Sequence, residues 1–480
     1  MTGMVQCGVG AIPAGCMKGH LFNLAPRIGF AYDPTGTGKM AIRGGYGIFF
    51  EHTNGNEATT ESLEGSPPLV LSASQFNIVG YENIGQTNNP AGGPLFFPLS
   101  VPSIPTRAVW PYVQQWHLDV QREIGKAVLT IAYVGSQGTH LTLQRDLNQI
   151  PALPLSLNPY NPGEPINAID PSTGLPHDDC STGQTASGIP VAGAAAINLA
   201  VACHVDPSPL RPFVGFGAIN RLEQAASSTY HALQASLRRR LGALQFSAAY
   251  TYSHAIDNSS ARFDDNIVDA YNPSASRASG DFDRRHVLNL GYIYDLPFYK
   301  KPGGASDLLG GWQFSGIITF ETGNPFSVAN FFSDNAGVAN GYGSGTYADL
   351  IGDPGTTPPA KVVEDVAGPL LFNPAAFGAP RGLTFGNSGR NLLRIPRRTN
   401  IDMALFKTVA ISDAKSFEFR AEAFNVFNHT QWAGINSAMT CYGGPLNSAA
   451  DPGCLASSNF LHPNSAHRAR ILQFGLKFIF

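Results

Sequence analysis

Apolar and polar residues alternate along several stretches of this chain, and the last ten residues show the pattern most clearly. Leu472, Phe474, Leu476, Phe478 and Phe480 fall on one face of an extended segment, and polar or small residues separate most of them. Successive side chains of a β-strand point to opposite sides of the sheet, so this period of two predicts a strand with one apolar face. In water a long aromatic face at a chain end would be an exposed edge that promotes aggregation, whereas lipid can cover such a face.

The same alternation recurs along the chain and predicts eleven strands, which short and long gaps separate in strict turn. In an up-and-down barrel this order places all the long connections at one end, as in a transmembrane barrel with short periplasmic turns and long extracellular loops. The short gaps are residues 34–39, 125–126, 241–243, 297–311 and 410–414, and the long gaps are residues 52–112, 138–227, 256–284, 323–399 and 428–469.

We therefore predict an all-β fold, an antiparallel up-and-down transmembrane β-barrel that is partial and has about eleven or twelve strands. Eleven is an odd number, whereas single-chain bacterial barrels have even numbers of strands. A soluble β-sandwich would show the same alternation, with its apolar face as the core, and only the order of the gaps argues against it. A soluble propeller would show an internal repeat of about 40–50 residues, and the sequence has none.

Composition agrees with a membrane barrel and excludes several other classes. Only 14% of the 480 residues are charged, whereas 43% are hydrophobic and 10% aromatic; an ordinary soluble domain has about 25% charged residues. The net charge of −3 leaves no basic excess to hold phosphates, so we expect no nucleic-acid partner. No apolar run approaches the roughly 18 residues that a membrane-spanning helix needs.

The six cysteines fall two by two into the leading segment and two long gaps. Their even number and local spacing favour disulfides over free thiols, in agreement with an oxidising compartment. A metal site would need closer Cys-x-x-Cys spacing or interleaved histidines, so we predict none. The expected pairs are Cys7–Cys16, Cys180–Cys203 and Cys441–Cys454.

Acidic residues crowd one extracellular gap beside arginines, and they are the candidates for binding a substrate. Carboxylates could hold a cation or a solute, but a salt-bridged base of the loop is the favoured interpretation, because structural ion-pair networks produce the same clusters. The candidate substrate-binding residues are Asp264, Asp265, Asp281 and Asp283, with Asp257, Arg262, Arg284 and Arg285 nearby.

Other polar and aromatic positions have structural interpretations. Residues 238–240 are three arginines beside a periplasmic turn, where they could contact lipid headgroups or a partner, although solvated arginines are commoner. Three charged residues are expected to face the lumen, and four aromatic residues to form the interfacial girdles. These are Glu418, Arg420 and Glu422 for the lumen, and Tyr112, Trp116, Tyr292 and Trp312 for the girdles.

No catalytic motif is present. The sequence has no Gly-x-Ser-x-Gly, no His-Glu-x-x-His and no phosphate-binding loop. The glycines at Gly44, Gly45 and Gly47 lie inside a predicted strand, where small residues leave room for a plug or for curvature of the sheet. We expect no enzymatic activity, no catalytic residues and no cofactor.

Several segments in order along the chain resemble the barrel of TonB-dependent receptors, specifically the Oar-like group. They cover the sequence from about residue 23 to the end, and together they are more specific than any one of them alone. The matching segments are residues 23–33 (NLAPRIGFAYD), 41–50 (AIRGGYGIFF), 115–122 (QWHLDVQR), 132–140 (AYVGSQGTH), 250–254 (YTYSH), 281–289 (DFDRRHVLN), 311–316 (GWQFSG), 418–429 (EFRAEAFNVFNH) and the terminal Phe480.

The resemblance implies an outer-membrane barrel that takes up a bulky extracellular solute, with an N-terminal plug pulled by a TonB-type energy-transducing complex. The sequence shows no signal peptide, plug or energy-coupling box, so we expect residues 27–480 to be the C-terminal part of such a barrel. Residues 1–26 would be the remnant of an extracellular loop. The chain alone would then not be competent for transport, and the alternative is an Oar-like surface or adhesion protein without uptake.

Overall fold

The structure is a computed structural model, and several segments of the chain fall outside its description. The described residues are 8–19, 22–51, 99–107, 109–151, 153–168, 170, 172–175, 177–203, 211–261, 268–297, 309–330, 346–355, 368–412, 415–439, 447–448, 451–452 and 459–480.

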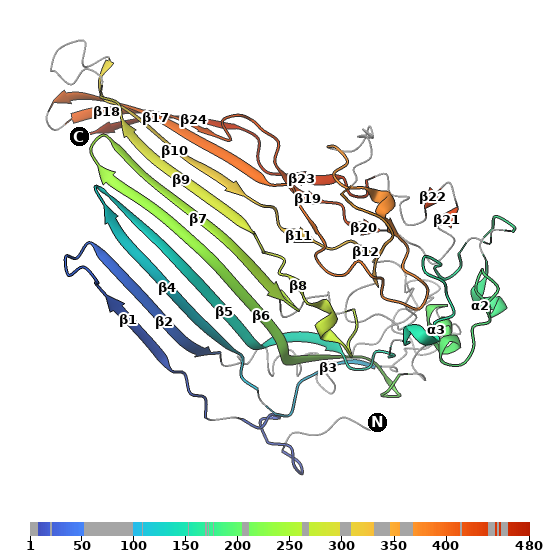
Figure 1. Ribbon diagram of the computed structural model, residues 1–480. Coiled ribbons are helices and arrows are strands. Elements are labelled where there is room, and N and C mark those ends of the chain that lie inside the picture. The colour runs from blue at the N-terminus through green and yellow to red at the C-terminus, as the bar shows by residue number, and fades with distance from the viewer. Residues whose placement is uncertain are drawn as a thin grey trace, which may run out of the picture.

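One large antiparallel sheet dominates the described part of the chain (Figure 1). Eleven strands form its path, each pairing with the next one along that path, and the sheet stays open between its first and last strand. The predicted all-β, up-and-down, partial barrel is thereby confirmed. The path runs through β1 (Arg27–Tyr32), β2 (Met40–Phe50), β4 (Tyr112–Ile124), β5 (Ala127–Asp146), β6 (Phe216–Leu241), β7 (Leu244–Asp257), β9 (His286–Asp295), β10 (Trp312–Glu321), β17 (Arg398–Ser412), β18 (Lys415–Phe424) and β24 (Ile471–Ile479).

Shorter elements lie in the long connections. β3 (Leu99–Ser103) pairs in parallel with β6, and β8 (Ala278–Ser279) extends the sheet beside β7. None of the helices in the described ranges is long and apolar enough to cross a membrane. The remaining elements are η3 (Leu155–Leu157), α2 (Asp179–Thr182), α3 (Ala194–Ala202), η5 (Pro273–Ser276), β11 (Pro325–Phe326), β12 (Ala329–Asn330), β13 (Thr346–Tyr347), β14 (Asp349–Leu350), η6 (Pro374–Ala376), β15 (Phe377–Gly378), β16 (Leu393–Arg394), β19 (Trp432–Ile435), β20 (Ala438–Met439), β21 (Asn447–Ser448), β22 (Asp451–Pro452) and β23 (Pro463–Ala466).

The strand register gathers the apolar residues on one side of the sheet. Leu237, Ala248, Leu290, Ile318 and Ile401 are successive partners across five strands, so they form one continuous apolar row. The positions between them carry polar residues on the opposite side. The apolar side is the outward side, and large residues on it such as Ile28 and Phe474 stay exposed, which is the arrangement of a sheet that faces lipid.

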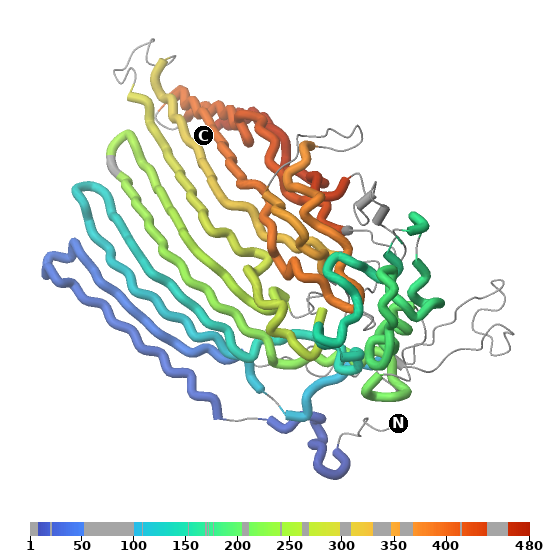
Figure 2. The backbone as a smooth tube through the Cα atoms, turned by 45° about the vertical axis from the view of Figure 1, so that its right-hand side comes forward, coloured from blue at the N-terminus to red at the C-terminus, as the bar shows by residue number. Residues whose placement is uncertain are grey.

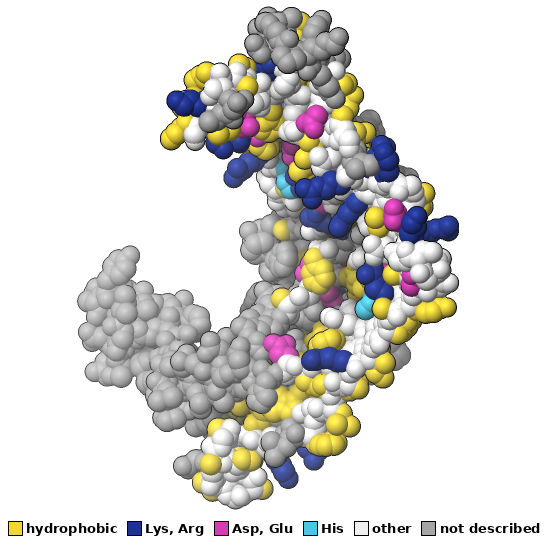
Figure 3. Space-filling view, turned by 90° about the vertical axis from the view of Figure 1, so that its left-hand side faces the viewer, with side chains coloured by type: hydrophobic (Ala, Val, Ile, Leu, Met, Phe, Trp, Pro, Cys, Tyr) yellow, Lys and Arg dark blue, Asp and Glu magenta, His cyan; other side chains and the backbone are white. Residues whose placement is uncertain are grey.

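Seen from the end that carries the short turns, the sheet curves around a hollow, so it has a concave inner face and a convex outer face (Figure 3). The outer face at the C-terminal strand is the most open. Phe474 and Leu476 of β24 keep 69% and 73% of their surface exposed. In water so large an exposed apolar face would be an aggregation surface, whereas a lipid bilayer covers it.

Short connections lie at one end of the sheet and long connections at the other (Figures 1 and 2). Two of the short turns depend on glycine, because Gly125 and Gly242 adopt positive φ angles of 60° and 73°. Residues with a Cβ rarely adopt that conformation. The tight turns of the predicted periplasmic end therefore form where the sequence places these glycines.

The predicted boundaries of one long loop are wrong. We expected residues 138–227 to be a connection, but β5 continues to Asp146 and β6 begins at Phe216. These extensions rise out of the apolar band, and loops cover them: Leu143 is fully buried and Ala226 is 1% exposed. Lipid no longer faces one side of the strands there, so the alternation that reveals a strand in the sequence is lost.

The buried hydrophobic clusters of the described chain lie largely in the loops rather than in the sheet. One contains Val328, Phe377, Phe460 and Leu461 from the last two long connections. Another packs Tyr160 against α3 and against Leu383, which comes from a different connection. The long loops therefore fold on one another as a water-exposed cap that has its own core.

A substitution at Gly135 tests the packing of the outward face. Trp116 of β4 lies over Gly135 of β5, its direct cross-strand partner, and a Cβ at Gly135 would overlap the indole ring. We expect Gly135→Val to lower the free energy of unfolding by about 1–3 kcal/mol, measured by urea unfolding in lipid vesicles.

The matched control is Gly475→Ala on the inner face of β24, where the added Cβ would lie 3.9 Å from the nearest atom, the Cβ of Arg420. That change is expected to stay within about 0.5 kcal/mol of the parent protein. Equal stability of both variants would contradict the packing of Trp116 on Gly135.

Candidate functional site

A buried arginine joins two long loops at the base of the cap. The guanidinium of Arg390 donates to Asp257 Oδ1 at 2.6 Å and to Asp281 Oδ1 at 2.8 Å, and its side chain has no exposed surface. Asp257 ends β7, whereas Arg390 lies 133 residues further along the chain, in the connection between β10 and β17. The ion pairs therefore anchor that connection to the rim of the sheet.

A second ion pair cluster lies beside the first. The buried carboxylate of Asp283 accepts hydrogen bonds from Arg394 and Arg285, the latter at 3.0 Å. It also accepts the backbone N–H of Ala255 at 2.7 Å, so it joins β7 to the start of β9. The side-chain amide of Asn391 donates a hydrogen bond of 2.6 Å to Oδ1 of Asp281. Charge-assisted bonds of this kind are roughly twice as strong as neutral ones.

Glu321, at the end of β10, continues this line of charges on the inner face. It is 9% exposed, pairs with Arg284 and lies 3.2 Å from Arg398. Arg284, just before β9, and Arg398, the first residue of β17, thus share one carboxylate at the mouth of the sheet. We call Asp257, Asp281, Asp283, Glu321 and the arginines paired with them the loop base.

The structure places part of the predicted acidic cluster here. Asp281 and Asp283 both belong to the loop base, and their carboxylates accept arginine donors. Arg262, Asp264 and Asp265 lie outside the described residues. Substrate binding by the four candidate aspartates stays a prediction, and the geometry around Asp281 and Asp283 is that of a salt-bridged loop base.

Arg390, Arg394 and Glu321 were missed by the sequence analysis. Arg390 and Asp257 are too far apart in the chain for any local pattern to pair them. The one available signal was the three arginines within residues 394–398, which end in the first residue of β17 and so lie at the long-loop end of a strand.

A second polar cluster stabilises the loop that carries α2 and α3. The carboxylate of Asp179 is fully buried and accepts hydrogen bonds from the Tyr160 hydroxyl at 3.0 Å and the backbone N–H of Asn167 at 2.8 Å. Its other oxygen lies 2.6 Å from Nδ1 of His177. Burial, with the neighbouring Asp179 charge, raises the pKa of the Tyr160 hydroxyl, so Tyr160 remains a hydrogen-bond donor at any physiological pH.

A disulfide joins Cys180 to Cys203 in the same loop and ties α2 to the end of α3. The loop is therefore held by a covalent bond as well as by the buried Asp179. The other two predicted pairs stay predictions, because Cys7, Cys441 and Cys454 lie outside the described residues.

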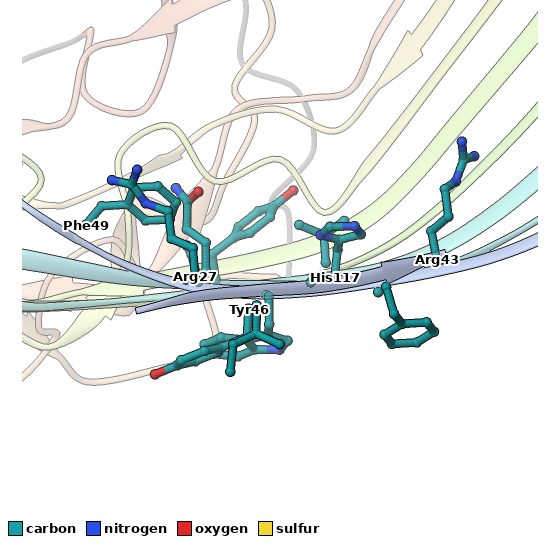
Figure 4. A pocket seen from close by; sticks show the side chains of 17 residues that line it. Arg27, Arg43, Tyr46, Phe49 and His117 are labelled. Atoms are coloured by element: carbon teal, nitrogen blue, oxygen red, sulfur yellow. The ribbon is translucent and has the colours of Figure 1, made fainter. Parts of the chain in front are cut away.

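The inner face of the first strands carries an open cavity of about 830 Å³. Figure 4 shows Arg27, Arg43, Phe49 and His117 on one side of the sheet and Tyr46 on the other. The Arg27 guanidinium lies 4.6 Å from the centroid of the Phe49 ring.

Small residues form the floor of this cavity. Gly45 and Gly47 lie between the side chains of Arg27, Arg43 and His117, and His117 packs directly over Gly45. Arg43 donates to Asp119 at 3.0 Å, which fixes its orientation along the inner wall. The predicted role of these glycines, to leave room on the lumen side, remains a prediction that this geometry permits.

The charged residues predicted to face the lumen and the aromatic residues Trp116 and Tyr292 lie on opposite faces of the sheet. Arg420 pairs with Glu418 of the same strand at 2.5 Å, and the strand register puts Glu422 on the same inner face. Trp116 lies on the outer face, with its ring centroid 5.9 Å from that of His231. Tyr292 contacts Phe314 there at 5.4 Å, again between centroids.

No group of three or more His, Cys, Asp or Glu side chains that could hold a metal ion occurs in the ranges that the structure describes. The described polar clusters instead consist of arginine–carboxylate pairs and hydrogen bonds. They can fix loops, and they can present charge to a solute at the mouth of the sheet.

Comparison with known families identifies the class of protein. The family model described as an outer membrane beta barrel domain matches residues 1–473. The chain belongs to this family, and its place is the outer membrane, as the alternating strands predict. A search of curated proteins finds no match.

Solved structures that align with this chain include one transporter and two receptors, and the chain spans less than half the length of each. The outer membrane transporter YddB from Escherichia coli aligns with a TM-score of 0.44 and 8% identity, over 95% of this chain and 40% of that one. BauA, the ferric preacinetobactin receptor from Acinetobacter baumannii, gives 0.40 and 8%, over 95% and 36%. The siderophore receptor PirA from the same organism gives 0.40 and 9%, over 95% and 41%.

Removal of the central arginine tests the loop base. Arg390→Met would leave Asp257 buried without its counter-charge, and breaking a buried ion pair costs about 3–5 kcal/mol. We expect the connection between β10 and β17 to become sensitive to protease while the sheet stays folded.

The exposed Arg277 serves as the control, since its hydrogen bonds to described residues are 3.4 Å contacts with the hydroxyl groups of Ser227 and Thr229. Arg277→Met is expected to change stability by less than about 0.5 kcal/mol. The double variant Arg390→Met/Asp257→Asn should recover part of the lost protease resistance, because it removes the unpaired charge. Wild-type resistance of the single Arg390 variant would refute the anchoring role.

The pH dependence of the α2–α3 loop provides another test. Burial alone would raise the pKa of Glu164, but the backbone N–H groups of Asn161 and Ser187 donate to its carboxylate, and the net pKa lies below its ordinary value of 4.5. A lowered pKa in the folded state means that the ionised carboxylate stabilises the loop. This stabilisation is complete above pH 4.5 and is lost as the pH falls through the folded pKa.

Hydrogen exchange of the loop amides, measured between about pH 6 and pH 3 and corrected for intrinsic rates, should therefore show loss of protection at the acid end. Glu164→Gln should weaken protection at neutral pH and flatten the profile. An unchanged profile in that variant would exclude Glu164 as the cause.

Proposed function

We propose that the chain is the C-terminal barrel portion of an outer-membrane TonB-dependent receptor that takes up a bulky solute. The observation that carries this proposal is the loop base. Buried ion pairs fix long loops into a folded cap at one mouth of a sheet whose inner face is polar. Such a cap can offer a preorganised surface to a solute before it enters the barrel.

The inner face supplies the second part of the argument. Its charged side chains are held by specific partners, such as Arg43 with Asp119 and Arg420 with Glu418. Beside them, the glycine floor near His117 leaves a cavity rather than a filled core. A polar wall with open space suits a lumen that receives a plug and lets a hydrated solute pass.

In this proposal residues 27–480 are barrel and residues 1–26 belong to an extracellular loop. A plug would occupy the hollow of the sheet, and a TonB-type complex would act through that plug. The chain alone would bind solute at the loops without coupling its passage to energy. Surface adhesion by the cap is the competing function, because a folded loop cap could equally contact another surface.

A cell-based experiment separates uptake from adhesion. In the native bacterium, the gene that encodes this barrel is deleted and then restored, and binding and accumulation of a panel of radiolabelled ferric chelates and cobalamin are measured. For a receptor we expect one solute to lose both binding and accumulation on deletion. A protonophore should abolish accumulation of that solute and leave its binding intact.

The variant Arg390→Met adds a structural readout to the same assay. It should weaken solute binding if the ordered cap selects the solute, whereas Arg277→Met should not. If deletion leaves every solute unaffected but reduces attachment to surfaces or other cells, the uptake proposal fails and the adhesion function takes its place.

A further inference from the structure

A second cavity opens at the long-loop end of β9, β10 and β17. It has a volume of about 500 Å³. Leu288, Phe320 and Thr399 are direct or successive cross-strand partners on the outward, apolar face of the sheet. The cavity therefore belongs to the surface that faces lipid, at the height where the strands leave the membrane.

The floor of this cavity is apolar and leads into the apolar face below it. Leu288 and Phe320 line it, and two residues further along the same strands lie Leu290 and Ile318, which pair with each other. A hydrocarbon chain lying on the barrel would contact this track continuously. A small hydrated anion has no apolar surface to bury, so contact with this track would add no binding free energy.

The upper wall of the cavity is cationic. Arg397 directly precedes β17 and is exposed, and within the described part of the chain it makes no ion pair. Glu321, the one carboxylate among the residues that line the cavity, has its side chain on the inner face, where it pairs with Arg284 and Arg398. The charge of Arg397 is therefore left to a ligand.

His286 and Tyr250 complete the wall. The Tyr250 hydroxyl and Nδ1 of His286 are 2.9 Å apart, so each orients the other and Nε2 of the imidazole stays directed elsewhere. The His286 ring also lies 4.9 Å from that of Tyr252, between centroids. Hydrogen-bonding aromatic groups of this kind are typical of the membrane interface, where one end of the side chain is apolar and the other is wet.

We propose that this cavity binds the phosphate-bearing headgroup of an outer-leaflet glycolipid, with Arg397 on the phosphate and Leu288 and Phe320 against an acyl chain. Arginine suits this role because its planar guanidinium binds phosphate through two parallel hydrogen bonds. The leaflet follows from the position of the cavity, since the long-loop end of an outer-membrane barrel is extracellular. This proposal does not depend on uptake.

The site is tested by substitution of Arg397, with Arg239 as the matched control. Arg239 of β6 is also exposed and lies on the outward face, but it stands beside the short turn at residues 242–243, at the opposite leaflet. The full chain and the variants Arg397→Gln, Arg397→Lys and Arg239→Gln are purified from outer membranes in detergent and stripped of lipid. Binding of bis-phosphorylated lipid A is then titrated by native mass spectrometry, with dephosphorylated lipid A and phosphatidylglycerol as separate probes.

We expect Arg397→Gln to weaken binding of bis-phosphorylated lipid A by about tenfold or more, the loss that one charge-assisted contact gives. Arg397→Lys should fall between that variant and the parent protein, and Arg239→Gln should bind like the parent. Dephosphorylated lipid A should bind all four proteins weakly and without distinction. Circular dichroism confirms that every variant keeps its β-structure.

Two results would overturn the proposal. Equal lipid A affinity of the parent and Arg397→Gln would show that the cavity does not hold the phosphate. If phosphatidylglycerol bound as tightly as lipid A and was equally sensitive to Arg397→Gln, the site would be a general anionic-lipid contact rather than a glycolipid site.

Discussion

The structure depends on one geometric constraint, the register that puts every apolar row of the sheet on the same face. Side chains alternate with a period of two, so a shift of one residue at any strand would turn its apolar set from lipid into the lumen. The partnership of Ile318 with Leu290 on one side and Ile401 on the other shows the constraint over three strands. Lipid is thus the solvent that selects the register, where a packed core would select it in a soluble sheet.

The same constraint separates two kinds of stabilisation within one chain. The sheet has no hydrophobic interior, since its apolar residues face outward and its inner face is polar. The loops lie in water and must bury apolar side chains of their own, which they do around Phe377, Phe460 and Tyr160. Buried ion pairs then fix this cap to the rim of the sheet. Desolvation makes such pairs poor sources of net stability, so their value lies in holding the loops in one arrangement.

Whether the structure of a segment can be predicted from the sequence depends on the solvent that the segment faces. Strands within the bilayer were predictable because lipid imposes an alternation that a reader of the sequence can see. The upper parts of β5 and β6 were not, because loops cover both faces there and residues such as Leu143 and Ala226 carry no period. Cys180 and Cys203 could be paired by their spacing, and the structure joins them. Arg390 and Asp257 could not be paired, because 133 residues separate them and only the folded loops bring them together.

The anchoring contacts also separate the constraints on the cap from those on the sheet. Arg390 and Arg394 bind carboxylates at or just beyond the strand ends, and none of these contacts involves the outward apolar rows. The lipid-facing register therefore places no demand on the residues that lie between the anchors. Those segments are constrained only by their own small cores and by the positions of the arginines that tie them down. A loop surface built from such segments can change in sequence while the membrane-spanning sheet below it keeps its register.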